Sequence, residues 1–422
     1  MPRITTIGAP KGQQTMANSV AVVWASDQSQ QTNPTSPTQV VSTPFTDIFR
    51  VFEFNFSNGD NKLFWYESLT GAGTSSINSN EACLTLTNTT ASGDKVTRQT
   101  QRHLYQIAVS QTITLGMLVG AKKTNVKQRW GSFDERDGFF FEQDSTNLKI
   151  VIRTYATGSA VDTAVNQSAW SVDKLDGTGT SGITLDTSKI NNYIINYVWD
   201  GGLFVRYGIV SNGIVYYCHK IDATNIDTAP EVTRPNLPIR AELENTGAAA
   251  SSTSMKIYAV SNHASSPSSG TGVLRAIDLG VTGRTTTGTL TPIMALRLKS
   301  ANYRGIVSVK SINLALGTNQ VVYYVVYYNP SLTAASFTAV PGTNTLTEYD
   351  ISATAISGGD IILSGYTDGS SGGNNVSPVD ITGDLKLSSN IAGTTDIVCL
   401  AAQKVSGTSP TTYASMLFAE YA

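Results

Sequence analysis

Four acidic side chains in the middle of the chain have the type and spacing for acid–base chemistry. Asp134, Glu135 and Asp137 precede a run of three phenylalanines, and Glu142 follows it. A pair of carboxylates is what a glycosidase uses to cleave a sugar linkage. The surrounding residues favour a different interpretation, in which residues 134–138 form the charged tip of a hairpin between two aromatic strands. We therefore expect no catalytic residues and no enzyme activity.

The other residue types that could do chemistry lack suitable partners. His103, His219 and His263 are far apart and do not have the spacing of a zinc site or of a Ser-His-Asp arrangement. The glycine-rich loop after Asp176 lacks the lysine and the following helix of a phosphate-binding loop. The sequence therefore predicts no cofactor and no metal.

Three aspartates and four tyrosines leave two interpretations open. Asp173, Asp176 and Asp186 have the oxygen ligands that calcium prefers, but we favour the interpretation that these side chains cap an exposed turn. One tyrosine-rich strand could form a sugar platform; its residues are Tyr323, Tyr324, Tyr327 and Tyr328. Since strand side chains alternate, these rings divide between two faces, which favours packing in a core or at a subunit interface.

These candidates must be positioned by an aromatic core between residues 128 and 199. Three of the five tryptophans lie in this stretch, and large rings bury the most area per residue. The predicted core aromatic cluster consists of Trp130, Phe133, Phe139, Phe141, Trp170 and Trp199. In a strand, Phe139 and Phe141 point to one side and Phe140 to the other, so we expect the pair to be buried between two sheets.

Composition indicates a β-rich protein with few charges. Only 14% of the 422 residues are charged and the formal net charge is −2, so the chain has no global field for nucleic acid or acidic membranes. No apolar run is long enough to span a membrane, and the first ten residues lack the apolar segment of a secretory signal. Cys83, Cys218 and Cys399 are odd in number and widely spaced, which predicts buried reduced thiols and folding in a cytosol.

The strand pattern predicts an all-β fold with more than one domain. Short alternating segments separated by turns argue for a jelly-roll-like β-sandwich followed by a second, smaller β-sandwich. The Ser211-Asn212-Gly213 turn is a strong hairpin signal. The predicted domains are an extended N-terminal arm (1–44), a large sandwich (45–260), a linker (261–272) rich in Ser, Gly and Pro, and a C-terminal sandwich (273–422).

The N-terminal segment 1–44 contains one short apolar run in polar surroundings. A lone strand of this kind cannot bury its own apolar side, so it folds back onto the body or pairs with another subunit. We interpret it as an attachment arm. Its interface residues are then Val20, Val22, Val23 and Trp24.

Several stretches resemble an uncharacterised family of tailed-bacteriophage virion structural proteins. The segment 25–29 is similar to a short sequence near the start of such proteins, and further similar segments cover most of the chain. These segments are 131–142, 170–179, 181–183, 234–240, 296–299, 327–330 and 395–403. The resemblance implies a particle component and provides no catalytic residues to carry over.

On this basis we expect a structural component of a tailed-phage virion, associated with the tail, baseplate or neck. Its expected partners are other virion proteins and further copies of itself in a homo-oligomer, with no nucleic acid and no membrane insertion. The protein would be made in the host bacterial cytoplasm and reside in the virion. The alternative is an exposed adhesin or head fibre that binds a receptor or a host surface glycan, and a polysaccharide depolymerase is the least favoured possibility.

Overall fold

The protein is built of β-strands, which confirms the predicted fold class. The computed structural model describes residues 49–266, 272–368, 379–380 and 386–421. Within these ranges the helical elements are two single 3-10 turns, η3 (Gln167–Ala169) and η4 (Ser300–Asn302). No helix in the same ranges is long and apolar enough to cross a membrane. The expected arm, with Val20, Val22, Val23 and Trp24, lies outside the described residues.

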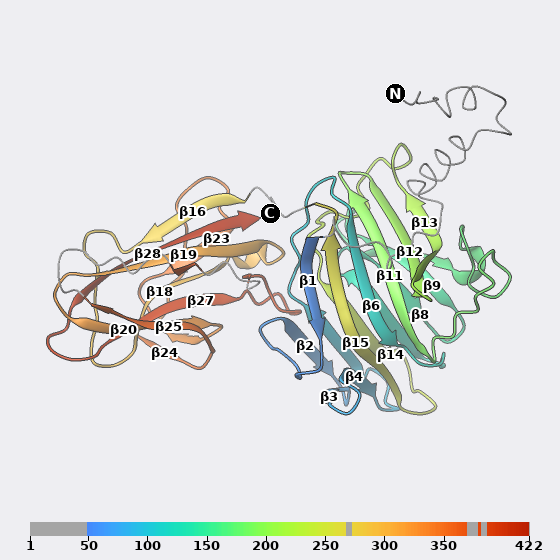
Figure 1. Ribbon diagram of the computed structural model, residues 1–422, viewed down its shortest axis with the longest axis horizontal. Coiled ribbons are helices and arrows are strands. Elements are labelled where there is room, and N and C mark those ends of the chain that lie inside the picture. The colour runs from blue at the N-terminus through green and yellow to red at the C-terminus, as the bar shows by residue number, and fades with distance from the viewer. Residues whose placement is uncertain (1–48, 267–271, 369–378, 381–385, 422) are drawn as a thin grey trace, which may run out of the picture.

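The larger sandwich packs an eight-stranded sheet against a seven-stranded sheet, counted over the described residues. Every strand pair in both sheets is antiparallel, as in jelly-roll-like folds (Figure 1). The first sheet has the order β13-β12-β11-β6-β15-β4-β3, with β1 pairing with β15. Its strands are β1 (Phe49–Asn55), β3 (Thr74–Asn78), β4 (Cys83–Asn88), β6 (Gln111–Leu118), β11 (Ile190–Trp199), β12 (Leu203–Ser211), β13 (Ile214–Asp222) and β15 (Thr253–Ala264). The second sheet has the order β10-β9-β8-β7-β14-β5-β2, and its strands are β2 (Trp65–Thr70), β5 (Lys95–Thr100), β7 (Val126–Phe133), β8 (Gly138–Gln143), β9 (Leu148–Thr154), β10 (Val161–Asn166) and β14 (Ile239–Asn245).

The smaller sandwich forms the second lobe of the molecule (Figure 1). Over the described residues it has a five-stranded sheet, a six-stranded sheet and a two-stranded sheet. The five-stranded sheet contains β16 (Val273–Asp278), β17 (Arg284–Thr285), β19 (Ile306–Leu316), β26 (Val379–Asp380) and β28 (Thr411–Tyr421). The six-stranded sheet contains β18 (Thr291–Leu298), β20 (Val321–Tyr328), β22 (Thr338–Ala339), β23 (Thr347–Asp350), β25 (Asp360–Asp368) and β27 (Ile397–Lys404). The two-stranded sheet pairs β21 (Ser331–Thr333) with β24 (Ala355–Ser357).

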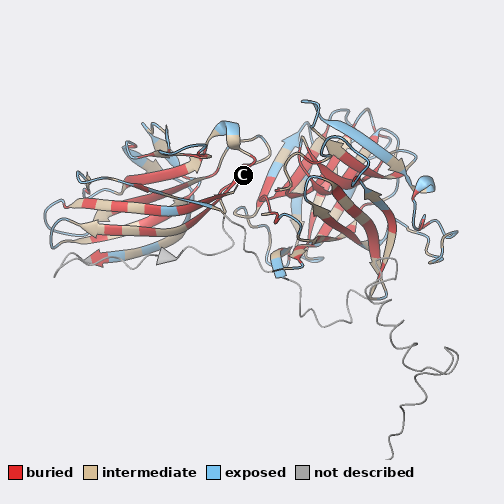
Figure 2. Ribbon diagram, turned by 90° about the horizontal axis from the view of Figure 1, so that it is seen from above, coloured by how far each residue is buried: buried red, intermediate tan, exposed pale blue. Residues whose placement is uncertain are grey.

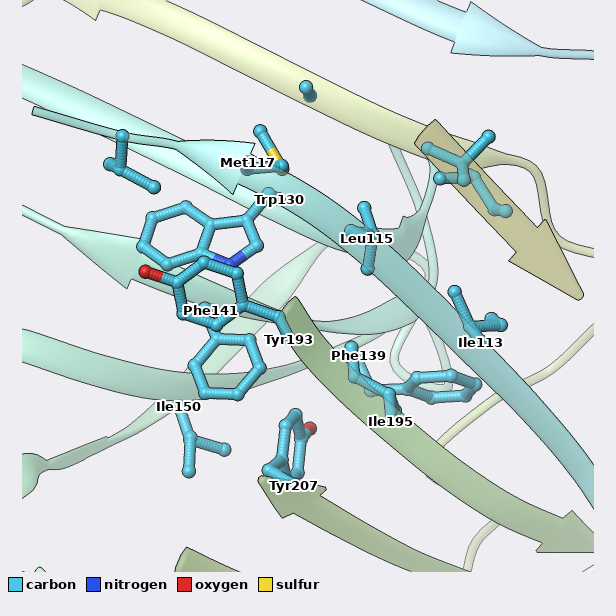
Figure 3. Packing of buried hydrophobic residues seen from close by; sticks show 14 of the residues in the cluster. Ile113, Leu115, Met117, Trp130, Phe139, Phe141, Ile150, Tyr193, Ile195 and Tyr207 are labelled. Carbon is cyan, nitrogen blue, oxygen red and sulfur yellow. The ribbon is translucent and has the colours of Figure 1, made fainter. Parts of the chain in front are cut away.

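Each lobe has its own buried core, visible as bands of buried residues along the strands (Figure 2). In the larger sandwich, Trp130 on β7 stands opposite Phe141 on β8, so both rings point into the space between the sheets. The two rings stack with their centroids 5.6 Å apart, and Tyr193 from the facing sheet meets Trp130 edge-on at 4.9 Å (Figure 3). Phe139 and Trp170 lie in the same core. Aromatic pairs of this geometry add to the stabilisation from burial alone.

Two residues of the expected aromatic cluster lie elsewhere. Phe133 is fully buried, but it packs with Phe140 and Val151 on the opposite face of the seven-stranded sheet, because its position in β7 is three residues from Trp130. The guanidinium carbon of Arg153 lies 5.9 Å from the Phe133 ring centroid. Trp199 is only half-buried at the end of β11, where it packs against the edge of the main core.

Two turns of the larger sandwich depend on residues with positive φ. The Asn212-Gly213 turn joins β12 to β13, and both residues adopt the positive φ that a tight hairpin requires. Residues 106–109 form a second turn, in which Ala108 has φ 60°. The expected linker also begins too early, because β15 continues through Ala264 and pairs with β1 and β6.

Replacing Phe141 by alanine should destabilise the larger sandwich by about 3–5 kcal/mol, because the change leaves a cavity among the stacked rings. Urea unfolding followed by circular dichroism measures the loss. A matched control is Val161→Ala on the exposed strand β10, which should change the free energy of unfolding by less than about 0.5 kcal/mol. Equal effects of the two substitutions would contradict the core assignment.

Candidate functional site at the junction of the two sandwiches

Residues 134–137 form the charged tip of the β7–β8 hairpin, as expected, and its two aspartates are buried. Asp134 and Asp137 are both fully buried. Within the tip, one carboxylate oxygen of Asp134 accepts hydrogen bonds from the backbone N–H groups of Arg136 at 2.8 Å and Asp137 at 2.9 Å. The backbone of the turn therefore orients the Asp134 carboxylate.

Arginines from both lobes neutralise these two aspartates. Arg102, in the segment after β5, places Nη1 2.6 Å from Asp134 Oδ2. Arg304, which follows η4 in the second lobe, places Nε 2.8 Å from the same oxygen. Its Nη2 lies 2.7 Å from Asp137 Oδ2. Burial alone would raise the pKa of Asp134, but the two guanidinium groups outweigh that effect and hold its pKa below the ordinary value.

A second buried polar contact joins the lobes near the start of strand β2. The hydroxyl of Tyr66 donates to Asp396 Oδ2 at 2.6 Å and lies 3.3 Å from the hydroxyl of Tyr328. The side-chain amide of Gln101 donates to the Tyr328 hydroxyl at 3.2 Å. Burial, with the neighbouring carboxylate as a smaller cause, raises the pKa of Tyr66 well above its ordinary value, and burial likewise raises the pKa of Asp396. Both junction contacts therefore consist of groups withdrawn from water.

An open cavity of about 750 Å³ lies beside this second contact and is lined by both lobes. On the larger sandwich its central side chain is Arg98 of β5, whose exposed fraction is 3%. Arg98 Nη2 lies 2.6 Å from Asp60 Oδ2, and its Nη1 lies 3.0 Å from Glu67 Oε2. The same Nη1 donates to the Ser75 hydroxyl at 3.0 Å. One guanidinium thus fixes two carboxylates and a hydroxyl at the cavity.

The facing wall comes from the smaller sandwich. The side-chain amide of Asn329 donates to Asp396 Oδ1 at 3.0 Å. Its side-chain oxygen, Oδ1, accepts from the backbone N–H of Ile397 at 2.8 Å. The neighbouring loop is closed by Asn390, which accepts from the backbone N–H of Thr394 at 2.9 Å. The cavity therefore presents carboxylates, amides and hydroxyls from short, fixed side chains.

The seven-stranded sheet carries a second concentration of charge on the face that points away from the core. Arg129 Nε lies 2.8 Å from Glu142 Oε2. The Nη1 atom of Arg129 lies 3.2 Å from Glu242 and 2.9 Å from Glu244. Burial would raise the pKa of Glu242, but Arg240, then Lys95 and Arg129, lower it to about 2. Glu242 is therefore ionised at neutral pH, and a pKa this low makes it a poor general base as well as a poor general acid.

The remaining sequence candidates serve local structure. His103 is buried, stacks on Phe52 with centroids 4.7 Å apart, and has its pKa lowered by burial to about 3. The Nδ1 atom of His219 accepts a hydrogen bond from the backbone of Ser171. His263 lies on β15 within hydrogen-bonding distance of the Ser261 hydroxyl. All three cysteines are buried and unpaired; they are Cys83, Cys218 and Cys399.

The aspartates considered as calcium ligands cap their own turns. Asp173 accepts from the backbone N–H groups of Leu175 and Ser181, and Asp176 and Asp186 each accept from the residue two positions on. Among the described residues, no group of three or more His, Cys, Asp or Glu side chains is arranged to hold a metal ion. The tyrosines of β20 divide as expected from strand alternation: Tyr328 is buried in the core, whereas Tyr323 packs against the exposed Tyr366 with ring centroids 5.2 Å apart.

Sequence reasoning missed the residues that form the junction. Tyr66 and Arg98 lie on strands β2 and β5, whose polar residues hide the alternation of a half-buried strand. Arg304 pairs with a residue 170 positions away. A single sequence contains no local signal for such a pairing, although Asp134 and Asp137 stood out as acidic residues in an apolar setting.

Comparison with known proteins bears on the fold alone. No protein-family model and no curated protein matches the chain. A solved endo-1,3-beta-glucanase from Streptomyces sioyaensis is similar at 11% identity with a TM-score of 0.36, over 53% of this chain and 99% of that one. A glycoside hydrolase family 16 endo-glucanase from Bacteroides ovatus has 11% identity and a TM-score of 0.34, over 50% and 99%. A legume lectin-like domain from Entamoeba histolytica has 11% identity and a TM-score of 0.28, over 47% and 89%.

These likenesses contradict our expectation that the chain is not an enzyme, because several of the similar structures are glucanases. That expectation is therefore withdrawn. At this level of identity the likeness carries over neither an activity nor a substrate to the present chain. The resemblance to phage virion proteins is not addressed by these structures and stays a prediction.

The ion-paired Glu242 predicts a defined acid sensitivity. Its pKa falls from the ordinary 4.5 to about 2 on folding, so the stabilisation is fully present above pH 4.5 and is lost as the pH falls towards 2. The stability difference between the wild type and Glu242→Gln should be on the order of 3 kcal/mol at pH 7 and should narrow steadily below pH 4.5. Urea unfolding at a series of pH values measures it. A difference that is constant with pH would contradict the proposed ionisation.

Loss of Arg304 should uncouple the two sandwiches. Arg304→Met leaves Asp137 without its arginine and should cost about 3–5 kcal/mol, because a buried charge loses its partner. Scanning calorimetry should show one coupled transition in the wild type and two separated transitions in the variant.

Lys256→Met, which breaks the more exposed ion pair with Glu81, is the matched control for this substitution. It should cost less than about 1 kcal/mol and leave a single transition. An unchanged transition in Arg304→Met would show that the junction does not couple the lobes.

Proposed function

We propose that the protein is a structural component of a tailed-phage virion, associated with the tail, baseplate or neck, where it mediates subunit assembly. The resemblance of segments along most of the chain to virion structural proteins is the basis for the class of protein. The proposal places the protein in the virion, in contact with further copies of itself and with other virion proteins.

The observation that carries the proposal furthest is the buried junction. A subunit that transmits mechanical load between neighbours needs its two halves in one fixed relative orientation. Arg304 contributes to this because it binds two aspartates on a hairpin of the other lobe, in a site withdrawn from water. Buried ion pairs of this kind favour one arrangement over others more than they add stability.

Two strands that are outermost in their sheets, among the described residues, support the assembly role. Strand β10 is the outer strand of the seven-stranded sheet, and most of its residues are exposed. Strand β16 lies at the edge of the five-stranded sheet and exposes Val273 and Leu274. Unpaired backbone groups and apolar side chains at a sheet edge are suited to pairing with a neighbouring chain.

A second candidate function is an exposed adhesin or head fibre that binds a receptor or a host glycan. The open cavity between the lobes favours it, because its walls contain carboxylates and amides that suit a polar ligand. The two roles are compatible in one particle, since a structural subunit can carry a ligand site on its outer surface.

Particle incorporation tests the assembly role. A phage that encodes the protein without residues 1–44 should produce particles that lack it, because the attachment strand is removed. Quantitative mass spectrometry of purified particles measures copy number, and calorimetry of the purified truncated protein should show the two sandwiches still folded. Val405→Ala, an exposed position that lies on neither β10 nor β16 and leaves the arm intact, is the control and should incorporate normally. Normal copy number of the truncated protein would contradict the attachment role.

An electron-microscopy map of the whole particle tests the oligomer. Each copy of the protein should contact at least one other copy, with strand edges such as β10 or β16 at the contact. A map in which the copies are isolated from one another, or a particle that lacks the protein altogether, would contradict the proposal.

A further inference from the structure

We propose that the junction cavity is a binding site for a neutral, hydroxyl-rich ligand, an oligosaccharide segment lying between the two sandwiches. The inference goes beyond assembly, because a subunit can enter the particle whether or not this site is filled. It rests on the side chains lining the cavity, their fixation and their charge balance.

The size of the cavity fits a ligand of several sugar units. Its volume of about 750 Å³ falls within the roughly 300–1,000 Å³ of small-molecule sites in proteins. The cavity is open to solvent, so part of a longer chain can extend out of it. Because both lobes line it, the junction contacts that fix the lobes also fix the shape of the site.

The carboxylates beside Arg98 are prepared to accept hydrogen bonds from hydroxyl groups. Asp60 and Glu67 each use one oxygen to bind the guanidinium, at 2.6 and 3.0 Å. Their side chains remain 22% and 38% exposed, so lone pairs are left for a ligand. A saccharide can donate neighbouring hydroxyls to the two carboxylates, which are held on either side of one planar group.

The charge of the lining favours a neutral ligand. Three carboxylates face the cavity, two of them ion-paired to Arg98, and Lys62 adds a second positive charge. An anionic ligand would meet Asp60 and Glu67, and a cationic one would meet Arg98 and Lys62. The two signs of charge in the lining therefore offset each other, which favours a ligand without net charge.

Short apolar side chains complete the match to a sugar. The lining includes Ile77 and Leu84 from the larger sandwich and Pro330 and Ile397 from the smaller one. Leu84 and Pro330 are buried, whereas the half-buried Ile77 and Ile397 can pack against the C–H faces of pyranose rings while Asn390 and the threonines beside it offer hydrogen bonds to the ring substituents. A site that mixes apolar and hydrogen-bonding groups in this way distinguishes a saccharide from a purely ionic ligand.

Calorimetric titration of the full-length protein tests the inference. The probes are cellotetraose, maltotetraose and β-1,4-galactotetraose, with trigalacturonic acid as a charged comparison and an uncharged tetrapeptide, Gly-Ser-Gly-Ser, as a different class of ligand. At least one neutral tetrasaccharide should bind with a Kd of about 1 mM or tighter, and the charged sugar at least about tenfold more weakly. Glu67→Gln should weaken binding about tenfold, because it removes a charged acceptor.

Glu348→Gln is the matched control, since Glu348 is also ion-paired to an arginine, Arg297, but lies outside the cavity. It should bind the sugar as the wild type does. Absence of binding by all three neutral tetrasaccharides, equal affinity in Glu67→Gln, tighter binding of the charged sugar, or binding of the peptide alone would each overturn the inference. Copy number of Glu67→Gln in purified particles is scored separately and should be normal, so a failed sugar site and a failed assembly role are distinguishable.

Discussion

The structure depends on a small group of buried charges where the two sandwiches meet. Asp134 and Asp137 occupy the tip of one hairpin, and Arg102 and Arg304 approach them from different lobes. None of these groups could be buried alone, because an unpaired charge in the interior costs several kcal/mol. The hairpin tip, the segment after β5 and the turn before β19 must therefore come together as one unit.

This constraint explains how a chain with few charges uses them. Charged residues are scarce overall, yet several are buried and paired. They are the aspartates and arginines of the junction, Arg98 with its two carboxylates, and Arg129 with its three glutamates. Elsewhere the sheets are held by aromatic and aliphatic side chains, as in the stack of Trp130 on Phe141. Hydrophobic packing supplies most of the stability of each lobe, whereas the ion pairs of Arg304 with Asp134 and Asp137 determine how the lobes are placed. The cavity lined by Arg98 is a consequence of that placement.

Much of the fold could be predicted from the sequence, but the junction could not. The Asn212-Gly213 turn and the alternation around Phe139 to Phe141 are local signals, and they place strands and core residues directly. Polar strands such as β5 lack that signal, because they face ion pairs instead of an apolar core on one side. The sequence placed Asp134 and Asp137 at a charged hairpin tip but contained no signal for the burial of that tip, since their arginine partners are remote in the chain.

The central claim is that the buried ion pairs hold the two sandwiches in a single relative orientation. Electron–electron dipolar spectroscopy tests it most directly, with spin labels on Val161→Cys in one lobe and Val405→Cys in the other; both positions are exposed, and the native cysteines are buried. The account predicts one narrow distance distribution in the otherwise unaltered protein and a broad one when Arg304→Met is added. A broad distribution in the protein with Arg304 intact, or an equally narrow one without it, would contradict the account.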